Sequence, residues 1–228
     1  MSVSTLTYVY GVTWASARRP DELDAVEHGE LAALTMPVDR RHLRAKRRDL
    51  LHHAEVIQRV FEAAPVLPFQ FGVVVDDAVD DLLEPRHDEL VRLLRELDGL
   101  VELTVRATYR EEDVLRTLLA EQPRLERLRE RGSPVQLGEA IARTLAARRD
   151  ADAHAIARTL QPLARASAVD ELRTELDVFR GAFLVERKRV KRFDREIERL
   201  ARAHAATTSF KLTGPLPPHH FVRLEEAA

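Results

Sequence analysis

The clearest pattern along this chain is a strict alternation of apolar and polar residues in LVELTVRATY, residues 100–109. Leu103, Val105 and Ala107 fall on one face of an extended segment. The polar residues fall on the opposite face: Glu102, Thr104, Arg106 and Thr108. A period of two is typical of a strand that buries one face and exposes the other. Residues 100–109 are therefore predicted to form a half-buried strand, with Glu102 on its polar side.

The pattern that follows alternates between helical and extended segments. Helices are predicted at residues 111–119, 137–160 and 186–205, with a charged connector at 123–134 and Pro162 ending the second helix. Strands are predicted at residues 164–169, 178–185 and 207–213, whereas residues 170–176 give no clear pattern. From residue 100 onward the order is strand, helix, strand, strand, helix, strand. This order is that of the split βαβ, ferredoxin-like fold.

The first half of the chain predicts strands and helices in a separate layered structure. Strands are predicted at residues 6–12, 28–37 and 66–75, the second broken by Pro37 and the third apolar enough to be buried on both faces. A helix capped by Asp39 is predicted to reach Ala63. Its apolar face is predicted from helical spacing: Leu43, Leu50, Ala54, Ile57 and Phe61. Another helix is predicted from Asp76 or Asp77 to about Leu97, interrupted by Pro85.

Asp98-Gly99 separates these two patterns. We therefore predict an α+β protein of two domains, an N-terminal α+β domain at residues 1–98 and a C-terminal ferredoxin-like (βαββαβ) domain at residues 99–228. The C-terminal domain ends in SFKLTGPLPPHHFV, residues 209–222. Its three prolines lack an N–H and favour extended neighbours, so the strand is predicted to end at Gly214-Pro215 in a rigid, polyproline-like tail.

Composition excludes several classes of protein. The chain has 228 residues and no cysteine, so disulfides, thiolate metal sites and thiol catalysis are excluded. No stretch approaches the roughly 18–20 apolar residues of a membrane span, and MSVSTLTYVYGV lacks the pattern of a secretory signal. The chain is 32% charged but carries a net charge of only −2, which argues against a dedicated nucleic-acid-binding protein. We expect a cytoplasmic protein that binds neither membrane nor nucleic acid.

Motifs for catalysis, cofactors and metals are missing from the sequence. The eight glycines form no dinucleotide or phosphate loop, and no serine lies in a GxSxG motif. The nine histidines include no HExxH, and the neighbouring His52 and His53 diverge by about 100° on a helix. Solvated or packed histidines are expected instead of metal ligands. We therefore predict no catalytic residue, no cofactor and no metal.

The predicted helix at 186–205 separates an apolar face from a basic one. The apolar face holds Val190, Phe193, Ile197, Leu200 and His204, and the basic face includes Arg195 and Arg199. The basic face is either a solvated surface or a docking surface for an acidic partner. RNA is a weaker alternative, because VFRGAFLV at 178–185 lacks the aromatic pattern of an RNA-recognition sheet.

Five segments together resemble the gas vesicle protein family GvpF/GvpL. They are YVYGV at 8–12, LPFQFG at 67–72, LDGLVELTVR at 97–106, GAFLVER at 181–187 and LTGPLPPHHFV at 212–222. The chain departs from the family pattern at Gln70, often an arginine, and at Leu216, often a tryptophan. His219 and His220 also replace an aromatic or small polar residue. The resemblance implies a two-domain α+β protein with a ferredoxin-like C-terminal half.

The resemblance further implies a minor, accessory component of gas vesicles that is not an enzyme. Such a protein is expected to help nucleate or assemble the gas-filled shell, and to contact the small hydrophobic shell protein and other accessory proteins. The residues predicted to bind this partner are Phe69, Gln70, Phe71, Arg195, Arg199, Pro215, Leu216, Pro217 and Phe221. The alternative for the aromatic residues is core packing, and for the prolines a rigid chain end. The alternative function is an enzyme or small-ligand regulatory domain of ferredoxin-like fold.

Overall fold

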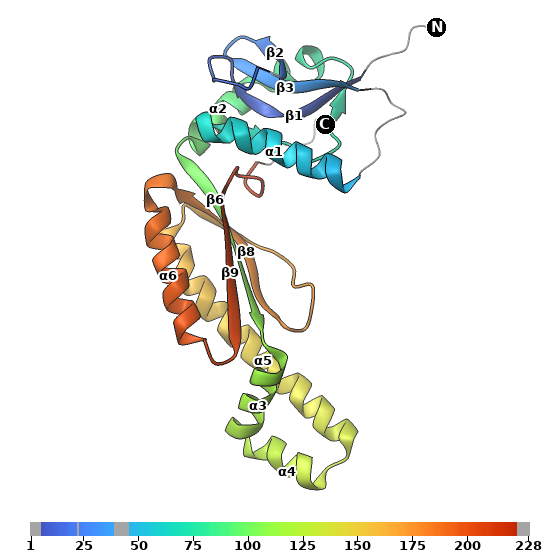
Figure 1. Cartoon of the computed structure of the whole chain (residues 1–228), viewed down its shortest axis with the longest axis vertical. Helices are drawn as coiled ribbons and strands as arrows, with labels where there is room; N and C mark the ends of the chain where they lie inside the picture. The colour runs from blue at the N-terminus through green and yellow to red at the C-terminus, as the bar shows by residue number, and fades with distance from the viewer. Residues whose placement is uncertain (1–5, 22, 39–45, 223–228) are drawn as a thin grey trace, which may run out of the picture. The chain divides into compact units, whose positions relative to one another are not determined.

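The structure, a computed structural model, describes residues 6–21, 23–38 and 46–222. It divides into two compact units, residues 1–102 with 215–228 (the first unit) and residues 103–214 (the second unit). The chain is α+β, as predicted, and the described residues form two antiparallel sheets (Figure 1). The sequence instead placed a boundary at residue 98 and grouped residues 215–228 with the second half. That division into independently folding domains stays a prediction.

The sheet of the first unit is built around its first strand, β1 (Leu6–Trp14). Its order is β2-β3-β1-β4, with β5 also paired to β1, and all these pairs are antiparallel. The other strands are β2 (Asp24–His28), β3 (Leu31–Val38), β4 (Val66–Pro68) and β5 (Val74–Val75). Nearly every residue of β1 is buried, because strands flank both of its edges and the helices α1 (Arg47–Ala63) and α2 (His87–Leu97) contact it.

A hairpin replaces the single strand predicted at residues 28–37. β2 and β3 pair from Asp24↔Thr35 to His28↔Leu31, joined by a two-residue turn in which Gly29 has a φ of 59°. Glycine adopts this conformation without steric cost. β3 also runs through Pro37 to Val38, so Pro37 does not end it. Because β2 reaches only Thr35, the missing N–H of Pro37 breaks no bond on that side of β3.

The strand predicted at residues 66–75 is interrupted. β4 and β5 both pair with β1, but residues 69–73 leave the sheet between them as the 69–73 bulge. The bulge is closed by Phe69 N–H donating to Tyr10 O at 2.9 Å and by Val9 N–H donating to Val73 O at 3.0 Å. Five residues therefore face two on β1. Burial on both faces, as predicted for the whole segment, holds for β4 and Phe69 but not beyond them.

Helix α1 (Arg47–Ala63) ends where the sequence predicted, whereas Asp39 and Leu43 lie outside the described residues. Its buried face differs from the predicted one: His53, Val56, Ile57, Val60 and Phe61. Leu50 and Ala54, which were expected on that face, are exposed. The three- and four-residue spacing of the buried set places His53 on the core side, where apolar side chains were predicted.

Two helical segments follow, as the proline at position 85 predicted. They are η2 (Val79–Leu83), a π-helical turn, and α2 (His87–Leu97). Asp77 caps the first segment, its Oδ1 accepting from the backbone N–H of Val79 at 2.7 Å. Side-chain oxygens at this position satisfy N–H groups that no helical carbonyl can reach.

The sheet of the second unit has the order β7-β8-β6-β9 (Figure 1). Its strands are β6 (Leu100–Tyr109), β7 (Ala166–Val169), β8 (Asp177–Glu186) and β9 (Thr208–Leu216). Its helices are α3 (Glu111–Glu121), α4 (Pro123–Arg131), α5 (Pro134–Leu160), η3 (Gln161–Leu163), η4 (Arg187–Arg189) and α6 (Val190–Ala203). Phe183 packs against Phe193 at 5.2 Å between ring centroids, which seats α6 on β8. The division between the units falls within β6 and β9.

Two predictions for this unit are wrong. The charged connector at residues 123–134 is mostly helix α4, because Pro123 occupies the first helical position, where its missing N–H costs nothing. The last strand does not end at Gly214 but continues through Pro215 to Leu216. β9 is an edge strand, and an edge tolerates proline where no ladder hydrogen bond is needed.

A buried carboxylate anchors the loop at residues 170–176, which the sequence left unassigned. Asp177 Oδ2 accepts from the backbone N–H groups of Arg173 and Thr174 at 3.1 and 3.2 Å. Its Oδ1 accepts from Nη2 of Arg106 at 2.8 Å. Burial alone would raise the pKa of Asp177, but these hydrogen bonds and the Arg106 charge lower it.

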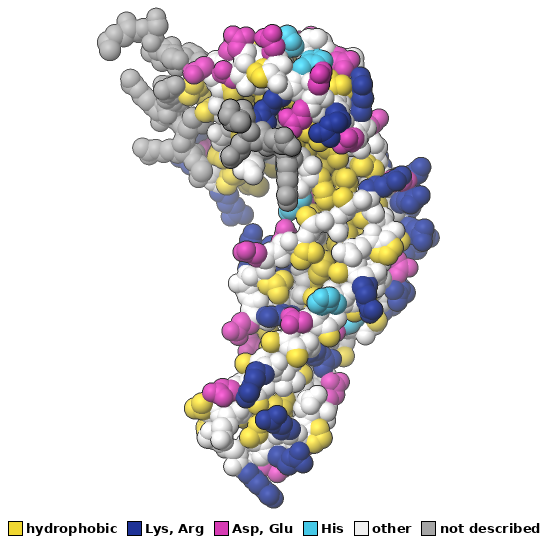
Figure 2. Space-filling model, turned by 180° about the vertical axis from the view of Figure 1, so that it is seen from behind, with side chains coloured by type: hydrophobic (Ala, Val, Ile, Leu, Met, Phe, Trp, Pro, Cys, Tyr) yellow, Lys and Arg dark blue, Asp and Glu magenta, His cyan; other side chains and the backbone are white. Residues whose placement is uncertain are grey.

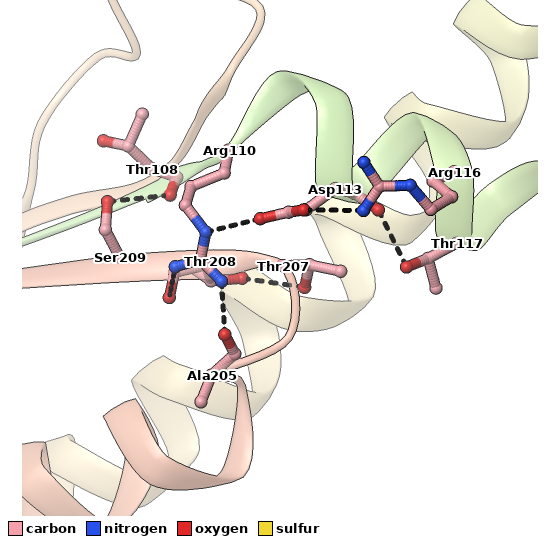
Figure 3. Close-up of polar contacts among 9 residues, drawn as sticks. All are labelled: Thr108, Arg110, Asp113, Arg116, Thr117, Ala205, Thr207, Thr208 and Ser209. Atoms are coloured by element: carbon pink, nitrogen blue, oxygen red, sulfur yellow. Dashed lines mark hydrogen bonds and ion pairs between the residues drawn. The ribbon is translucent and has the colours of Figure 1, made fainter.

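Arg110 joins the start of α3 to the turn between α6 and β9 (Figure 3). Its Nε donates to Asp113 Oδ2 at 2.7 Å, and its Nη2 donates to the carbonyl of Ala205. Its backbone N–H donates to Thr207 O at 2.8 Å. One side chain therefore satisfies a carbonyl just beyond the C-terminal end of α6.

Candidate binding groove

A hydrogen-bond relay through His53 holds the 69–73 bulge against β1 and α1. His53 Nε2 lies 3.0 Å from Phe69 O and must donate to it, since a carbonyl only accepts. Nδ1 then accepts from the hydroxyl of Tyr8 at 2.7 Å, and the Tyr8 oxygen accepts from Gly72 N–H at 3.3 Å. The relay requires a neutral imidazole with its proton on Nε2. Burial, chiefly, lowers the pKa of His53, with a smaller effect of His52 in the same direction.

Aromatic rings pack around this relay. Tyr10 stacks on His53 at 5.5 Å between centroids, and Phe71 lies 5.8 Å from the same imidazole. Phe69 is 6% exposed, Phe71 is half-buried and Gln70 is exposed. Phe69 therefore packs mainly in the core and reaches the surface with only a small part of its side chain, whereas Gln70 and the edge of Phe71 form surface.

The proline-rich tail, residues 215–222, returns to the first unit and folds into a turn there. Pro217 and Pro218 are buried, and Phe221 and Val222 donate their N–H groups to Pro218 O at 3.1 and 3.2 Å. The prediction of a polyproline-like extension is therefore wrong beyond Pro218. Residues after Pro218 have backbone N–H groups, so the chain can close a hydrogen-bonded turn there.

Glu102 holds this turn in place. Its Oε2 accepts from the backbone N–H of His220 at 2.8 Å, and its Oε1 accepts from Nδ1 of the same residue at 2.7 Å. Glu102 is 1% exposed, so its predicted place on a solvated face is wrong. The alternation of residues 100–109 concerns one strand only. It contains no information about His220, which lies 118 residues further along the chain.

Three segments of the first unit enclose a groove of about 810 Å³. Its lining comes from the 69–73 bulge and the adjoining β4, from the η2–α2 region, and from the tail. The lining residues are Pro68, Phe69, Gln70, Val73, Leu82, Arg86, His219, His220 and Val222. The walls are largely apolar, and π-helical turns such as η2, which supplies Leu82, occur frequently at functional sites.

The charged and titratable groups of the groove are few. Arg86 is 19% exposed at its side chain, and Nη1 of Arg86 is buried without a hydrogen-bond partner. The counter-charge beside it is the carboxylate of Glu89, whose Oε2 lies 3.8 Å from Nη1 of Arg86. The pKa of His219 is lowered, first by desolvation among the surrounding protein atoms and then by repulsion from His53 and His220. Part of the His219 side chain is nevertheless exposed. At neutral pH the groove therefore presents a neutral His219 and one cationic guanidinium.

The structure brings some of the predicted partner-binding residues together and separates others. Phe69 and Gln70 line the groove, and Phe221 lies in the turn that closes it. Pro215 is exposed, Leu216 is half-buried and Pro217 is buried on the approach to that turn. Arg195 and Arg199 lie on α6 of the second unit.

The basic face of α6 is exposed, and its apolar face buries Phe193, Ile197 and Leu200 as predicted. Arg199 pairs with Glu196 at 2.8 Å on the same helix. On the face shown in Figure 2, basic and acidic side chains both occur over the two units. An ion pair between neighbouring side chains of one exposed helix is typical of a solvated surface, the first of the two interpretations of this basic face. Docking at Arg195 and Arg199 stays a prediction.

The sequence analysis missed Arg86 and the structural roles of His53 and Glu102. A signal existed for His53, since its spacing to Val56, Ile57 and Val60 puts it on one helical face. Residues 6–21, 23–38 and 46–222 contain no group of three or more acidic or histidine side chains that could hold a metal ion. No helix among those described is long and apolar enough to cross a membrane.

The comparison with protein families matches residues 6–223 to the family described as gas vesicle synthesis protein GvpL/GvpF. The chain is 34% identical to gas vesicle protein F of Streptomyces sp. (strain CB03234), covering 95% of this chain and 99% of that protein. It is 30% identical to gas vesicle protein L of the same strain, covering 99% and 96%. The fold is similar to the crystal structure of GvpF from Anabaena sp. PCC7120, with a TM-score of 0.83 and 19% identity over 97% of this chain and all of that one.

Proposed function

The chain belongs to the GvpL/GvpF family of gas vesicle synthesis proteins, and on that premise we propose that it is an accessory protein of gas vesicle assembly. It helps to nucleate or assemble the gas-filled shell by binding the small hydrophobic shell protein, together with other accessory proteins. It acts in the cytoplasm and at the gas vesicle. Its task is binding and not catalysis, which agrees with a family of gas vesicle proteins that is not a known enzyme family.

The observation that carries this proposal is the groove of the first unit. Its apolar walls, contributed by Pro68, Phe69, Val73 and Leu82, suit an apolar segment of another chain. A shell subunit that exposes apolar surface and strand edges before assembly is prone to aggregate. A partner that covers a short apolar segment would keep such a subunit available for ordered addition.

The finer description of the fold is part of the same proposal. We assign the second unit to the ferredoxin-like class, supported by the strand order β7-β8-β6-β9 and by helices between β6 and β7 and between β8 and β9. Many functions share this class, so the class does not itself specify a partner.

Co-expression with the shell protein tests the proposal directly. The wild-type protein is expected to keep the shell protein in the supernatant and to be captured with it. Val73→Asp places a charge in the groove wall and is expected to abolish capture. The matched control is Val135→Asp, at a site on α5 that is 69% exposed, and it should leave capture unchanged.

Three further variants locate the contact among the predicted residues. Phe71→Ala and Phe221→Ala are expected to weaken capture, because both flank the groove, and Arg195→Glu/Arg199→Glu tests the predicted contact on the basic face of α6. If the double charge reversal alone abolished capture, the contact surface would lie on α6. The small-ligand alternative remains a distinct outcome, since the groove volume falls within the roughly 300–1,000 Å³ of small-molecule sites. A metabolite that co-purifies with the protein, and that leaves with Val73→Asp, would support that alternative.

A further inference from the structure

Arg86 combines a mostly buried side chain with a guanidinium that makes no hydrogen bond to the described part of the chain, whereas Arg19, which also leaves its Nη1 buried without a partner there, is bound through Nη2. Arg19 pairs with Glu27 at 2.6 Å, and Arg92 and Arg95 pair with Glu96 and Glu30 at 3.1 and 3.3 Å. The latter two arginines are 58% and 67% exposed, yet each makes its hydrogen bond. The side chain of Arg86 is only 19% exposed, and among the described residues its guanidinium makes no hydrogen bond.

A guanidinium in this position lacks the partners that burial normally demands. Leaving a buried charged donor unsatisfied costs more than leaving a neutral one unsatisfied, and such a group in a native protein calls for an explanation. Glu89 does not relieve this cost, because its Oε2 lies 3.8 Å from Nη1 of Arg86, which is beyond hydrogen-bond range. The donor set is therefore available to an anion.

The surroundings of Arg86 define which anion fits. Arg86 lines the groove with Phe69, Val73 and Leu82, which would desolvate a bound group. Glu102, which holds the tail turn behind the groove lining, already receives two hydrogen bonds from His220. A planar carboxylate matches the fork of a guanidinium and can be bound by two parallel hydrogen bonds.

We propose that the groove recognises an apolar peptide segment carrying one acidic side chain, whose carboxylate is bound by Arg86 while the flanking apolar side chains lie on Phe69, Val73 and Leu82. The inference rests on the proposed function and specifies the chemistry of the partner. Binding displaces the guanidinium from its long contact with Glu89 toward the carboxylate. The apolar walls bind the apolar side chains of the segment. The pair of Arg86 with the carboxylate favours a segment that carries an acidic side chain.

The test uses overlapping synthetic peptides that cover the shell protein, each prepared in its natural form and with Asp and Glu replaced by Asn and Gln. Binding to the full-length protein is measured for the wild type, Arg86→Gln and Arg86→Lys. The control is Arg92→Gln, which removes a guanidinium from the exposed face of α2, the helix that begins directly after Arg86. Thermal unfolding of each variant is recorded to establish that it is folded.

We expect the wild type to bind at least one acidic apolar peptide about 10- to 100-fold more tightly than its amide form. Arg86→Gln should lose this preference while still binding the amide form, Arg86→Lys should retain part of it, and Arg92→Gln should retain all of it. If the wild type captures the intact shell protein, but a folded Arg86→Gln protein still prefers the acidic peptide over its amide form, the inference about Arg86 is wrong and the proposed function stands. Failure of the wild type to bind any peptide and to capture the shell protein would overturn the proposed function as well.

Discussion

Glu102 and His220 are bound to each other by two hydrogen bonds, although they lie 118 residues apart in the chain. The carboxylate is 1% exposed, and a carboxylate so deeply buried is stable only when donors surround it. The backbone N–H and the imidazole of His220 both supply such donors. This pair therefore fixes the tail where it closes the groove.

Glu102→Gln is expected to release the tail. The amide keeps one acceptor oxygen but places an NH₂ group against a donor, so the unfolding free energy should fall by about 1–3 kcal/mol. Hydrogen exchange at His219, His220, Phe221 and Val222 should accelerate. Glu96→Gln, at a residue whose side chain is 56% exposed, is the control and should leave this exchange unchanged. Equal exchange in both variants would contradict the role of Glu102.

His53→Ala is expected to destabilise the protein by about 2–4 kcal/mol, because it leaves a cavity and deprives Phe69 O and the Tyr8 hydroxyl of their partner. Chemical denaturation measures the change. The adjacent His52 is exposed, so His52→Ala should change the unfolding free energy by less than about 0.5 kcal/mol. Similar effects of the two substitutions would rule out the relay as a stabilising element.

The same histidine predicts a pH dependence of stability. Unfolded histidine titrates near pH 6.5, and burial lowers the pKa of His53 in the native state. The unfolded chain therefore binds more protons than the native protein between these two pKa values, so stability falls as the pH drops below about 6.5. Urea midpoints measured between pH 8 and pH 5 should fall less steeply for His53→Gln than for the wild type. An unchanged slope would show that His53 does not contribute.

Gly11→Ala should destabilise the first unit by about 3 kcal/mol, since its Cβ would lie 2.4 Å from the backbone oxygen of Leu67 on β4. Backbone in a paired strand cannot move aside cheaply. Gly138, within α5, is the matched control, because its added Cβ meets no atom within 4 Å. Gly138→Ala should stabilise by about 0.5–1 kcal/mol through helix propensity. Thermal unfolding of both variants measures the opposite signs.

Asp177→Asn is expected to loosen the loop at residues 170–176 and to cost about 1–3 kcal/mol, because a charged acceptor of the Arg106 hydrogen bond is lost. The native pKa of Asp177 is lowered, so its contribution is present above the unfolded pKa near 3.9 and is lost as the pH falls through the native value. Proteolysis of the loop should increase in the variant. The control is Asp150→Asn, whose side chain is 69% exposed.

Local periodicity was sufficient for much of the fold. The strict alternation of residues 100–109 predicted β6 with its observed bounds, and the spacing of Phe193, Ile197 and Leu200 predicted the buried face of α6. Pro85 predicted the interruption after η2, and Asp77 is one of the two aspartates, Asp76 or Asp77, that were predicted to begin this segment. These features depend on neighbours within a few residues, which the sequence states directly.

The groove required the tertiary structure. Phe69 and Gln70 were predicted as partner-binding residues on a continuous strand, but pairing of β4 and β5 with β1 displaces them into a bulge. In the sequence, Glu102 has the pattern of a solvated strand residue, but in the structure it binds His220. Arg86 looks like one of many surface arginines in the sequence, but in the structure its Nη1 is buried without a hydrogen-bond partner.

The sequence by itself determined the α+β class, the alternation of strands and helices from residue 100 onward, the absence of cysteine chemistry and the resemblance to the family. Only the tertiary structure decided which side chains meet at the groove. The physical reason is that periodicity records which face of an element avoids water, whereas a satisfied or unsatisfied polar group depends on atoms that arrive from distant parts of the chain.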